Sequence, residues 1–258
     1  MRRGALILAI VISACGAGPA AAERLVASLS NENVAITSNF VGENLVLFGA
    51  IQPDAGKTAL RPAYDLVVTV TGPRQTLRTR RKQRVLGIWV NVDSREFVRV
   101  PSYLVILSNR PVAQIAQPDT LRRLQIGLAN FLLPQHIGPD IADTVGDDPF
   151  RLAFVRLQIQ QRRYAEIGSA VTFLTPAVFR AGIPLPADVP TGNYTVDVKL
   201  FADGAMVART NLALTVTKAG FEQYVADAAR DNGLLFGFVT MLMALLTGWI
   251  ASVVFKRD

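Results

Sequence analysis

The two residue types that most often do chemistry, cysteine and histidine, each occur once in this chain of 258 residues. Cys15 stands near the start, so the rest of the chain offers no thiolate nucleophile and no cysteine-based metal site. A Ser-His-Asp triad could be built only around His136, and zinc sites that need several His or Cys ligands are excluded. His136 lies in the polar segment LPQHIGPDIADTVGDDP, which predicts a loop with a surface histidine, and no two acidic residues stand out as a pair. We therefore expect a non-enzymatic protein with no catalytic residue, no metal and no cofactor.

A dense basic run is the strongest candidate for binding, because no acid occurs between Asp65 and Asp93. Clustered guanidinium groups can hold a sulfite, sulfate or phosphate oxyanion, or the headgroups of anionic lipids. The alternative is a solvated hairpin whose charges keep a sheet edge from pairing with neighbours. The candidates for contact with an anion or a partner are Arg78, Arg80, Arg81, Lys82 and Arg84.

Trp89 follows this run and is flanked by Ile88 and Val90. An indole there could be a recognition platform, but its large apolar area favours a place in the core. We predict Trp89 as a core residue.

The elements that must position these residues are mainly β. Residues 23–109 and 166–218 contain short apolar or alternating stretches separated by Gly, Pro and Asn, which is typical of immunoglobulin-like sandwich domains. Asp203-Gly204 between two alternating stretches predicts a hairpin turn. Residues 110–165 change to helical spacing, with Asp148 as a helix cap and Pro149 in the first turn. The pattern leaves open whether the two β regions form one sandwich or two.

Both ends of the chain are apolar. Residues 234–255 contain no charge and would reach roughly 33 Å as a helix, which is enough for a hydrocarbon core of about 30 Å. We therefore predict a C-terminal transmembrane helix at 233–255, an amphipathic juxtamembrane helix at 219–232 and a short cytoplasmic tail at 256–258.

The first residues predict a secretory signal peptide at 1–22, with a positive start, a short apolar stretch and cleavage after Ala22. The alternative is lipidation at Cys15, since Ile12-Ser13-Ala14 precedes it with suitable small residues. With Lys256 and Arg257 after the spanning helix, the expected layout is a bacterial inner-membrane protein, N-outside and C-inside, with most of the chain in the periplasm. The mature protein would keep a basic excess of about five charges, but this compartment makes nucleic acid an improbable partner.

The predicted spanning helix also carries small residues near one face, which would let a second helix approach closely. The helix-docking candidates are Gly233, Gly237, Ala244, Gly248 and Ser252. A plain anchor is the alternative, because glycine is common in spanning helices.

The strings VAITSNFVGENLVLFGA, RRKQRVLGIWVN and VPTGNYTVDVKLFADG, with the closing GFEQ and TGWIASVVFK, resemble a family of predicted alphaproteobacterial single-pass transmembrane proteins of about this length. The resemblance covers nearly the whole mature chain. It implies a link with permeases of the sulfite-exporter type and carries no catalytic residue with it.

The sequence thus favours a non-enzymatic accessory or scaffold protein of the inner membrane, partnered by a permease, another membrane protein or a second copy. The alternative is a membrane-tethered periplasmic module that binds a small oxyanion or an anionic envelope component. A hydrolase built on His136 ranks below both.

Overall fold

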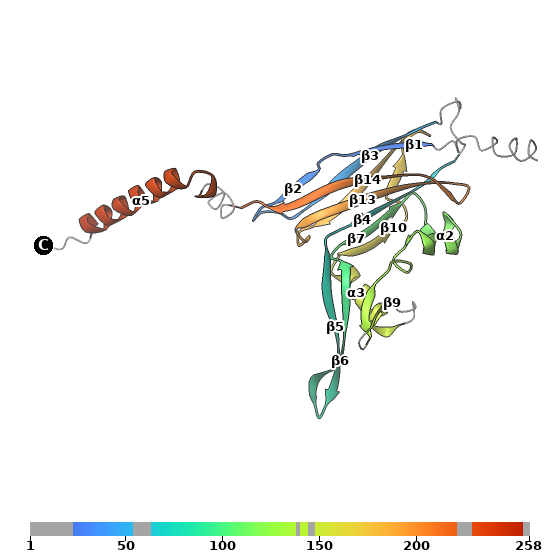
Figure 1. Ribbon diagram of the computed structural model, residues 1–258, viewed down its shortest axis with the longest axis horizontal. Coiled ribbons are helices and arrows are strands. Elements are labelled where there is room, and N and C mark those ends of the chain that lie inside the picture. Colours follow the sequence, from blue (N-terminus) through green and yellow to red (C-terminus); the bar gives the residue numbers. More distant parts are fainter. Residues whose placement is uncertain (1–22, 54–62, 138–139, 144–147, 221–228, 255–258) are drawn as a thin grey trace, which may run out of the picture.

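The computed structural model describes residues 23–53, 63–137, 140–143, 148–220 and 229–254 (Figure 1). The predicted signal peptide at 1–22 and the predicted tail at 256–258 lie outside these residues. So does most of the juxtamembrane helix predicted at 219–232.

Two sheets are each built from strands of both β regions. The first has the order β1 (Arg24–Leu29), β3 (Gly42–Gln52), β12 (Val178–Pro186) and β11 (Val171–Phe173). The second has the order β10 (Tyr164–Ile167), β7 (Leu104–Ser108), β4 (Asp65–Thr71), β13 (Gly192–Ala202), β14 (Ala205–Lys218) and β2 (Asn33–Ile36). Because β3 pairs with β12 and β4 pairs with β13, the two β regions interleave in one sandwich.

Strand β4 contributes side chains to two hydrophobic cores, one on each of its faces. Leu66, Val68 and Val70 alternate toward the first sheet and join the core between the two sheets. Val67 points the other way, into a second core beneath the helical layer. Alternate residues of a strand point to opposite faces, and here both faces are covered, so β4 is buried at nearly every position.

The helical layer covers the second sheet on the side away from the first. It comprises η1 (Val112–Gln114), α2 (Pro118–Arg123) and α3 (Pro149–Gln160). The Asp148 carboxylate accepts a hydrogen bond from the Arg151 backbone N–H at 3.1 Å, and Pro149 opens α3, which confirms both predicted start signals. The helical spacing that continues beyond α2 is misleading, because left-handed backbone at Gln125 and Gly127 turns the chain there.

A third sheet leaves the body of the molecule. It has the order β5 (Arg74–Val85), β6 (Ile88–Pro101), β8 (Pro134–Ile137) and β9 (Asp140–Asp143). In Figure 1 the β5–β6 hairpin projects far beyond the sandwich and the helices. His136, predicted in a loop, lies in β8 opposite Ile141, because the polar segment forms a small hairpin against β6.

The C-terminal helix α5 spans Gly233–Val254. Within the part of the chain that the structure describes, no helix is long and apolar enough to cross a membrane, so the spanning helix predicted at 233–255 is not confirmed. The mainly β fold is confirmed, whereas its immunoglobulin-like character stays a prediction.

Candidate functional site

The base of the β5–β6 hairpin is fixed by aromatic packing. Phe97 of β6 is fully buried and stacks on Phe154 of α3 with ring centroids 4.3 Å apart. The Arg95 guanidinium lies over the Phe150 ring at 5.2 Å from its centroid, a cation–π arrangement. The hairpin therefore leaves the body from a rigid root.

Beyond this root the hairpin packs on none of the residues that the structure describes. Every residue from Arg80 to Ser94 is exposed, on both strands and both faces. At a rise of about 3.4 Å per residue, the distance from Arg80 to the turn at Leu86 is roughly 20 Å. An isolated two-stranded hairpin is only marginally stable in water, so this projection adds little to folding.

The tip of the hairpin is apolar. Leu86 is 100% exposed, Trp89 is 69% exposed and Ile88 is 67% exposed, and three further exposed residues adjoin them: Val85, Val90 and Val92. The prediction that Trp89 belongs to the core is wrong, because the indole lies beyond the reach of either sheet. Contiguous exposed apolar residues are typical of a contact surface.

The turn at the tip uses an unfavourable residue. Leu86 and Gly87 both have positive φ, 49° and 87°. Two-residue turns of this kind favour Asn, Asp or Gly at the first position, because a side chain with a Cβ crowds the backbone there. Leu86 is strained in this conformation and is also fully exposed. We infer that its apolar side chain serves a contact at the tip and not the stability of the turn.

The basic candidates all lie on this hairpin, so the structure brings the predicted set together. Arg80, Arg81, Lys82 and Arg84 stand opposite Ser94, Asp93, Asn91 and Trp89. Arg78 lies nearer the root with its guanidinium 3.7 Å from the Glu96 carboxylate, an exposed pair of the kind worth at most about 1 kcal/mol. The cations therefore form a collar directly behind the apolar tip.

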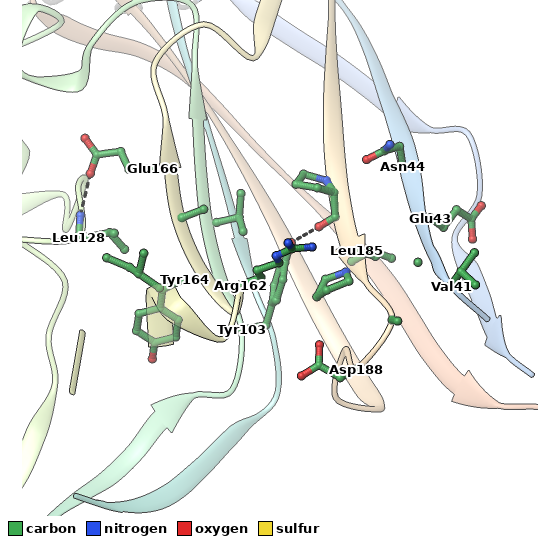
Figure 2. Close-up of a pocket in the computed structure, with 17 residues that line it drawn as sticks. Val41, Glu43, Asn44, Tyr103, Leu128, Arg162, Tyr164, Glu166, Leu185 and Asp188 are labelled. Carbon is green, nitrogen blue, oxygen red and sulfur yellow. Dashed lines mark hydrogen bonds between the residues drawn. The ribbon is translucent and has the colours of Figure 1, made fainter. Parts of the chain in front are cut away.

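A large groove opens elsewhere, between the starts of β3 and β7, the end of β12, and β10. It has a volume of about 890 Å³. Figure 2 shows Glu166 and Glu43 at opposite ends of this groove, so these two carboxylates do not converge on a shared point. Glu166 accepts a hydrogen bond from the Leu128 backbone N–H at 3.0 Å, and Asp188 lies 3.5 Å from Arg163.

Two buried tyrosines line the same groove (Figure 2). The Tyr103 hydroxyl donates to the Pro184 carbonyl, and the Tyr164 hydroxyl donates to the Pro101 carbonyl at 2.7 Å. Burial raises the pKa of both phenols. Both hydroxyls thus stay protonated and tie the strands together, which is a structural role.

A smaller cavity on the outer face of β4 and β13 is rich in cations. It has a volume of about 540 Å³, and its charged lining residues are Arg74, Arg123, Asp197, Lys199 and Arg209. Lys199 and Asp197 form an ion pair, and the Arg209 guanidinium holds the same carboxylate at 2.8 and 3.1 Å.

Two buried groups characterise this cavity further. Burial lowers the pKa of Lys199, with the nearby Asp197 opposing that effect. The Thr69 hydroxyl lines the cavity, is buried and has no hydrogen-bond partner among the described residues. Sequence alternation assigns Asp197 and Lys199 to the solvent face and so misses the cavity, because the residues after α2 that line it with them are distant in sequence.

Helix α5 exposes large apolar side chains over slightly more than half of its circumference, at 100° per residue, and Ala244 is exposed on the remaining face. The residues spread over the larger arc are Phe238, Val239, Met241, Leu242 and Met243. The hydroxyls of Thr240 and Thr247 bond to carbonyls one turn earlier, at 3.0 Å to Phe236 and 2.9 Å to Met243. The docking candidates Gly233, Gly237, Ala244, Gly248 and Ser252 all lie on α5, and the three glycines face open space.

Among the described residues, no three His, Cys, Asp or Glu side chains gather as a metal site would require. Comparison with curated proteins yields no match. One family model matches residues 24–257, almost the whole chain, and its description is "Putative transmembrane protein (Alph_Pro_TM)". The chain belongs to this family.

Proposed function

We propose that this protein is a non-enzymatic accessory protein of the bacterial inner membrane that is attached through α5 and holds its β body against the membrane. The observation that carries the proposal is the apolar surface around α5. A helix that is apolar all round is stable only in lipid or inside a protein, because each exposed apolar Å² costs about 25 cal/mol in water. Membership of a transmembrane family supports the lipid environment.

The polar groups of α5 support the same environment. The Thr240 and Thr247 hydroxyls are bonded within the helix, so they do not require water. In this proposal the bulk of the chain lies in the periplasm.

Membrane extraction tests the attachment. The full chain should stay with membranes after an alkaline carbonate wash, and Leu242→Lys with Leu246→Lys should release it into the supernatant. Leu152→Lys is the matched control, because Leu152 on α3 is at least as exposed as Leu242 and Leu246, and its replacement should release nothing. Release of the unmodified chain by the wash would contradict the proposal.

The partner that we propose is another membrane protein such as a permease, whose helix packs on the small-residue face of α5. At 100° per residue, Gly237 and Gly248 lie on one face and Val239 on the opposite one. Gly237→Leu with Gly248→Leu should abolish co-purification of the partner, whereas Val239→Leu should preserve it. Undiminished co-purification with both glycines replaced would reject this face.

A second candidate function has its own observation. The cation-rich cavity with Lys199 and the unpaired Thr69 hydroxyl favours binding of a small oxyanion such as sulfite, sulfate or phosphate. This binding would be at the cavity and not at the exposed hairpin. A ligand that binds only the folded state raises its stability, so sulfate should raise the unfolding temperature of the full chain.

Three substitutions separate the two places. Arg123→Gln should abolish the effect of sulfate, because Arg123 lines the cavity. Arg122→Gln, its exposed neighbour, and Arg81→Gln, on the hairpin, should leave the effect intact. Loss of the effect in Arg81→Gln alone would move the anion site to the hairpin.

A further inference from the structure

The distal β5–β6 hairpin has an exposed apolar tip and a basic collar, and neither the packing of the sandwich nor attachment through α5 accounts for them. We propose that its tip, from Val85 to Val90, inserts into an anionic phospholipid surface, with the basic collar on the lipid phosphates. This goes beyond attachment through α5, since it gives the β body its own contact with the membrane.

The order of residues along the hairpin fits the profile of a bilayer surface. Interfacial elements bury apolar groups about 5–10 Å into the boundary between headgroups and acyl chains. Leu86, Ile88 and Trp89 occupy that outermost level. Tryptophan favours this level, because its ring is apolar and its N–H can still find a polar partner.

The cations lie one level farther back. Arg84 is two residues from Leu86 and Arg80 is six, which places the collar roughly 7–20 Å behind the tip at about 3.4 Å per residue. With the tip inserted by about 5–10 Å, Arg84 lies at the level of the lipid phosphates, and the cations farther back reach that level when the hairpin lies obliquely. Arg84 donates its Nε–H to the Gly87 carbonyl at 3.2 Å, which leaves its other guanidinium nitrogens for a phosphate.

The pairing of the two strands gives the hairpin two different faces. Val85 stands opposite Ile88, and Gln83 opposite Val90, so one face of the tip is nearly all apolar. Arg84 stands opposite Trp89, and Lys82 opposite Asn91, so the other face combines the indole with cations. A hairpin with this distribution can lie obliquely with its apolar face toward acyl chains and its basic face toward headgroups.

A second copy of the chain fits this surface less well. Strand β5 is an edge of its sheet, and two β5 strands side by side would bring six cations against six. Charged side chains on an edge strand oppose such pairing. The same charges attract a surface of fixed negative charge, so the complementarity favours anionic lipid.

The residue at the turn allows structure and function to be separated. Leu86→Asn should stabilise the turn, because asparagine tolerates positive φ better than leucine. It should weaken insertion, because it removes the outermost apolar side chain. If Leu86 served only the fold, the same substitution would leave lipid contact unchanged.

The test uses the full chain with Trp249→Phe, which leaves Trp89 as the only tryptophan. The protein is reconstituted in phosphatidylcholine vesicles with or without 30 mol% phosphatidylglycerol, each containing a brominated acyl chain as a quencher. Trp89 emission should shift to shorter wavelength and lose at least half its intensity in the anionic vesicles. Neutral vesicles should neither shift nor quench Trp89 emission. In anionic vesicles, 0.5 M salt should weaken the quenching, because it screens the attraction between collar and lipid.

The variants define the outcomes. Replacing Arg80, Arg81, Lys82 and Arg84 with Gln should restore Trp89 intensity to its value in neutral vesicles, and Leu86→Asn should restore most of it while raising the unfolding temperature. Absence of quenching in anionic vesicles would overturn the inference. Shielding of Trp89 in native membranes alone would then assign the tip to a protein partner and would overturn it as well.

Flotation of the same samples distinguishes this failure from failure of the proposed function. A chain that floats with both kinds of vesicle but shows no quenching keeps its attachment through α5 and loses the hairpin contact. A chain that floats only with anionic vesicles keeps the hairpin contact and loses the attachment through α5. A chain that floats with neither loses both.

Discussion

The two long hairpins of this protein, β13–β14 and β5–β6, have the same kind of turn but opposite surroundings. Asp203 and Gly204 join β13 to β14 with φ values of 51° and 78°, and Leu86 and Gly87 join β5 to β6 with φ values of 49° and 87°. The β13–β14 hairpin lies inside the six-stranded sheet, whereas the distal part of β5–β6 contacts neither core (Figure 1).

The difference teaches how to separate residues that fold the chain from residues that make contacts. In β13–β14, an acid that tolerates left-handed backbone occupies the turn and the apolar residues point into the core. In β5–β6, a leucine occupies the turn and the apolar residues point into solvent. The residues of the first hairpin stabilise the fold. The residues at the tip of the second do not, and their exposure suits contact with another surface.

The largest expected effect is a loss of folding stability from a core substitution in β13–β14, compared with a tip substitution in β5–β6. Leu200→Ala in β13 should lower the free energy of unfolding by about 2–5 kcal/mol, because Leu200 is fully buried and leaves a cavity. Ile88→Ala at the hairpin tip should change it by less than about 0.5 kcal/mol. Urea unfolding of the two variants measures both values, and equal losses would show that the tip is part of the folded core.

Exchanging the residue types of the two turns should change folding stability in opposite directions. Asp203→Leu should destabilise the protein by about 1 kcal/mol, since it places a bulky residue in left-handed backbone. Leu86→Asn should stabilise it by a similar or smaller amount, about 0.5–1 kcal/mol. Thermal unfolding resolves these shifts, and a loss of stability in Leu86→Asn would contradict the strained turn.

The smallest effect concerns charge. Burial lowers the pKa of Lys199 below its ordinary value of 10.5, so between the two values the unfolded chain binds more protons than the folded one. Through this group, stability rises with pH toward 10.5. Lys199→Met should remove that rise, while Lys82→Met on the exposed hairpin should keep it. Denaturant midpoints across pH 8–10.5 check this, and an unchanged slope in Lys199→Met would count against the buried cation.

Much of this comparison is predictable from local sequence. Asp203-Gly204 between alternating strands predicts its hairpin, Asp148-Pro149 predicts the start of α3, and the run around Arg81 predicts a basic hairpin, because each depends on neighbours along the chain. The exposure of Trp89 is not predictable in this way, since it depends on where the body ends. The same is true of the cavity at Lys199, whose walls come from distant segments.

Hydrogen–deuterium exchange of the full chain in nanodiscs tests the central claim, that β5–β6 is built for contact with lipid and β13–β14 for folding. Peptides covering 83–92 should exchange fast in phosphatidylcholine discs and at least tenfold more slowly in discs with 30 mol% phosphatidylglycerol. Peptides covering 195–202 should be protected equally in both. Fast exchange of 83–92 in anionic discs, or equal protection in both kinds of disc, would contradict the account.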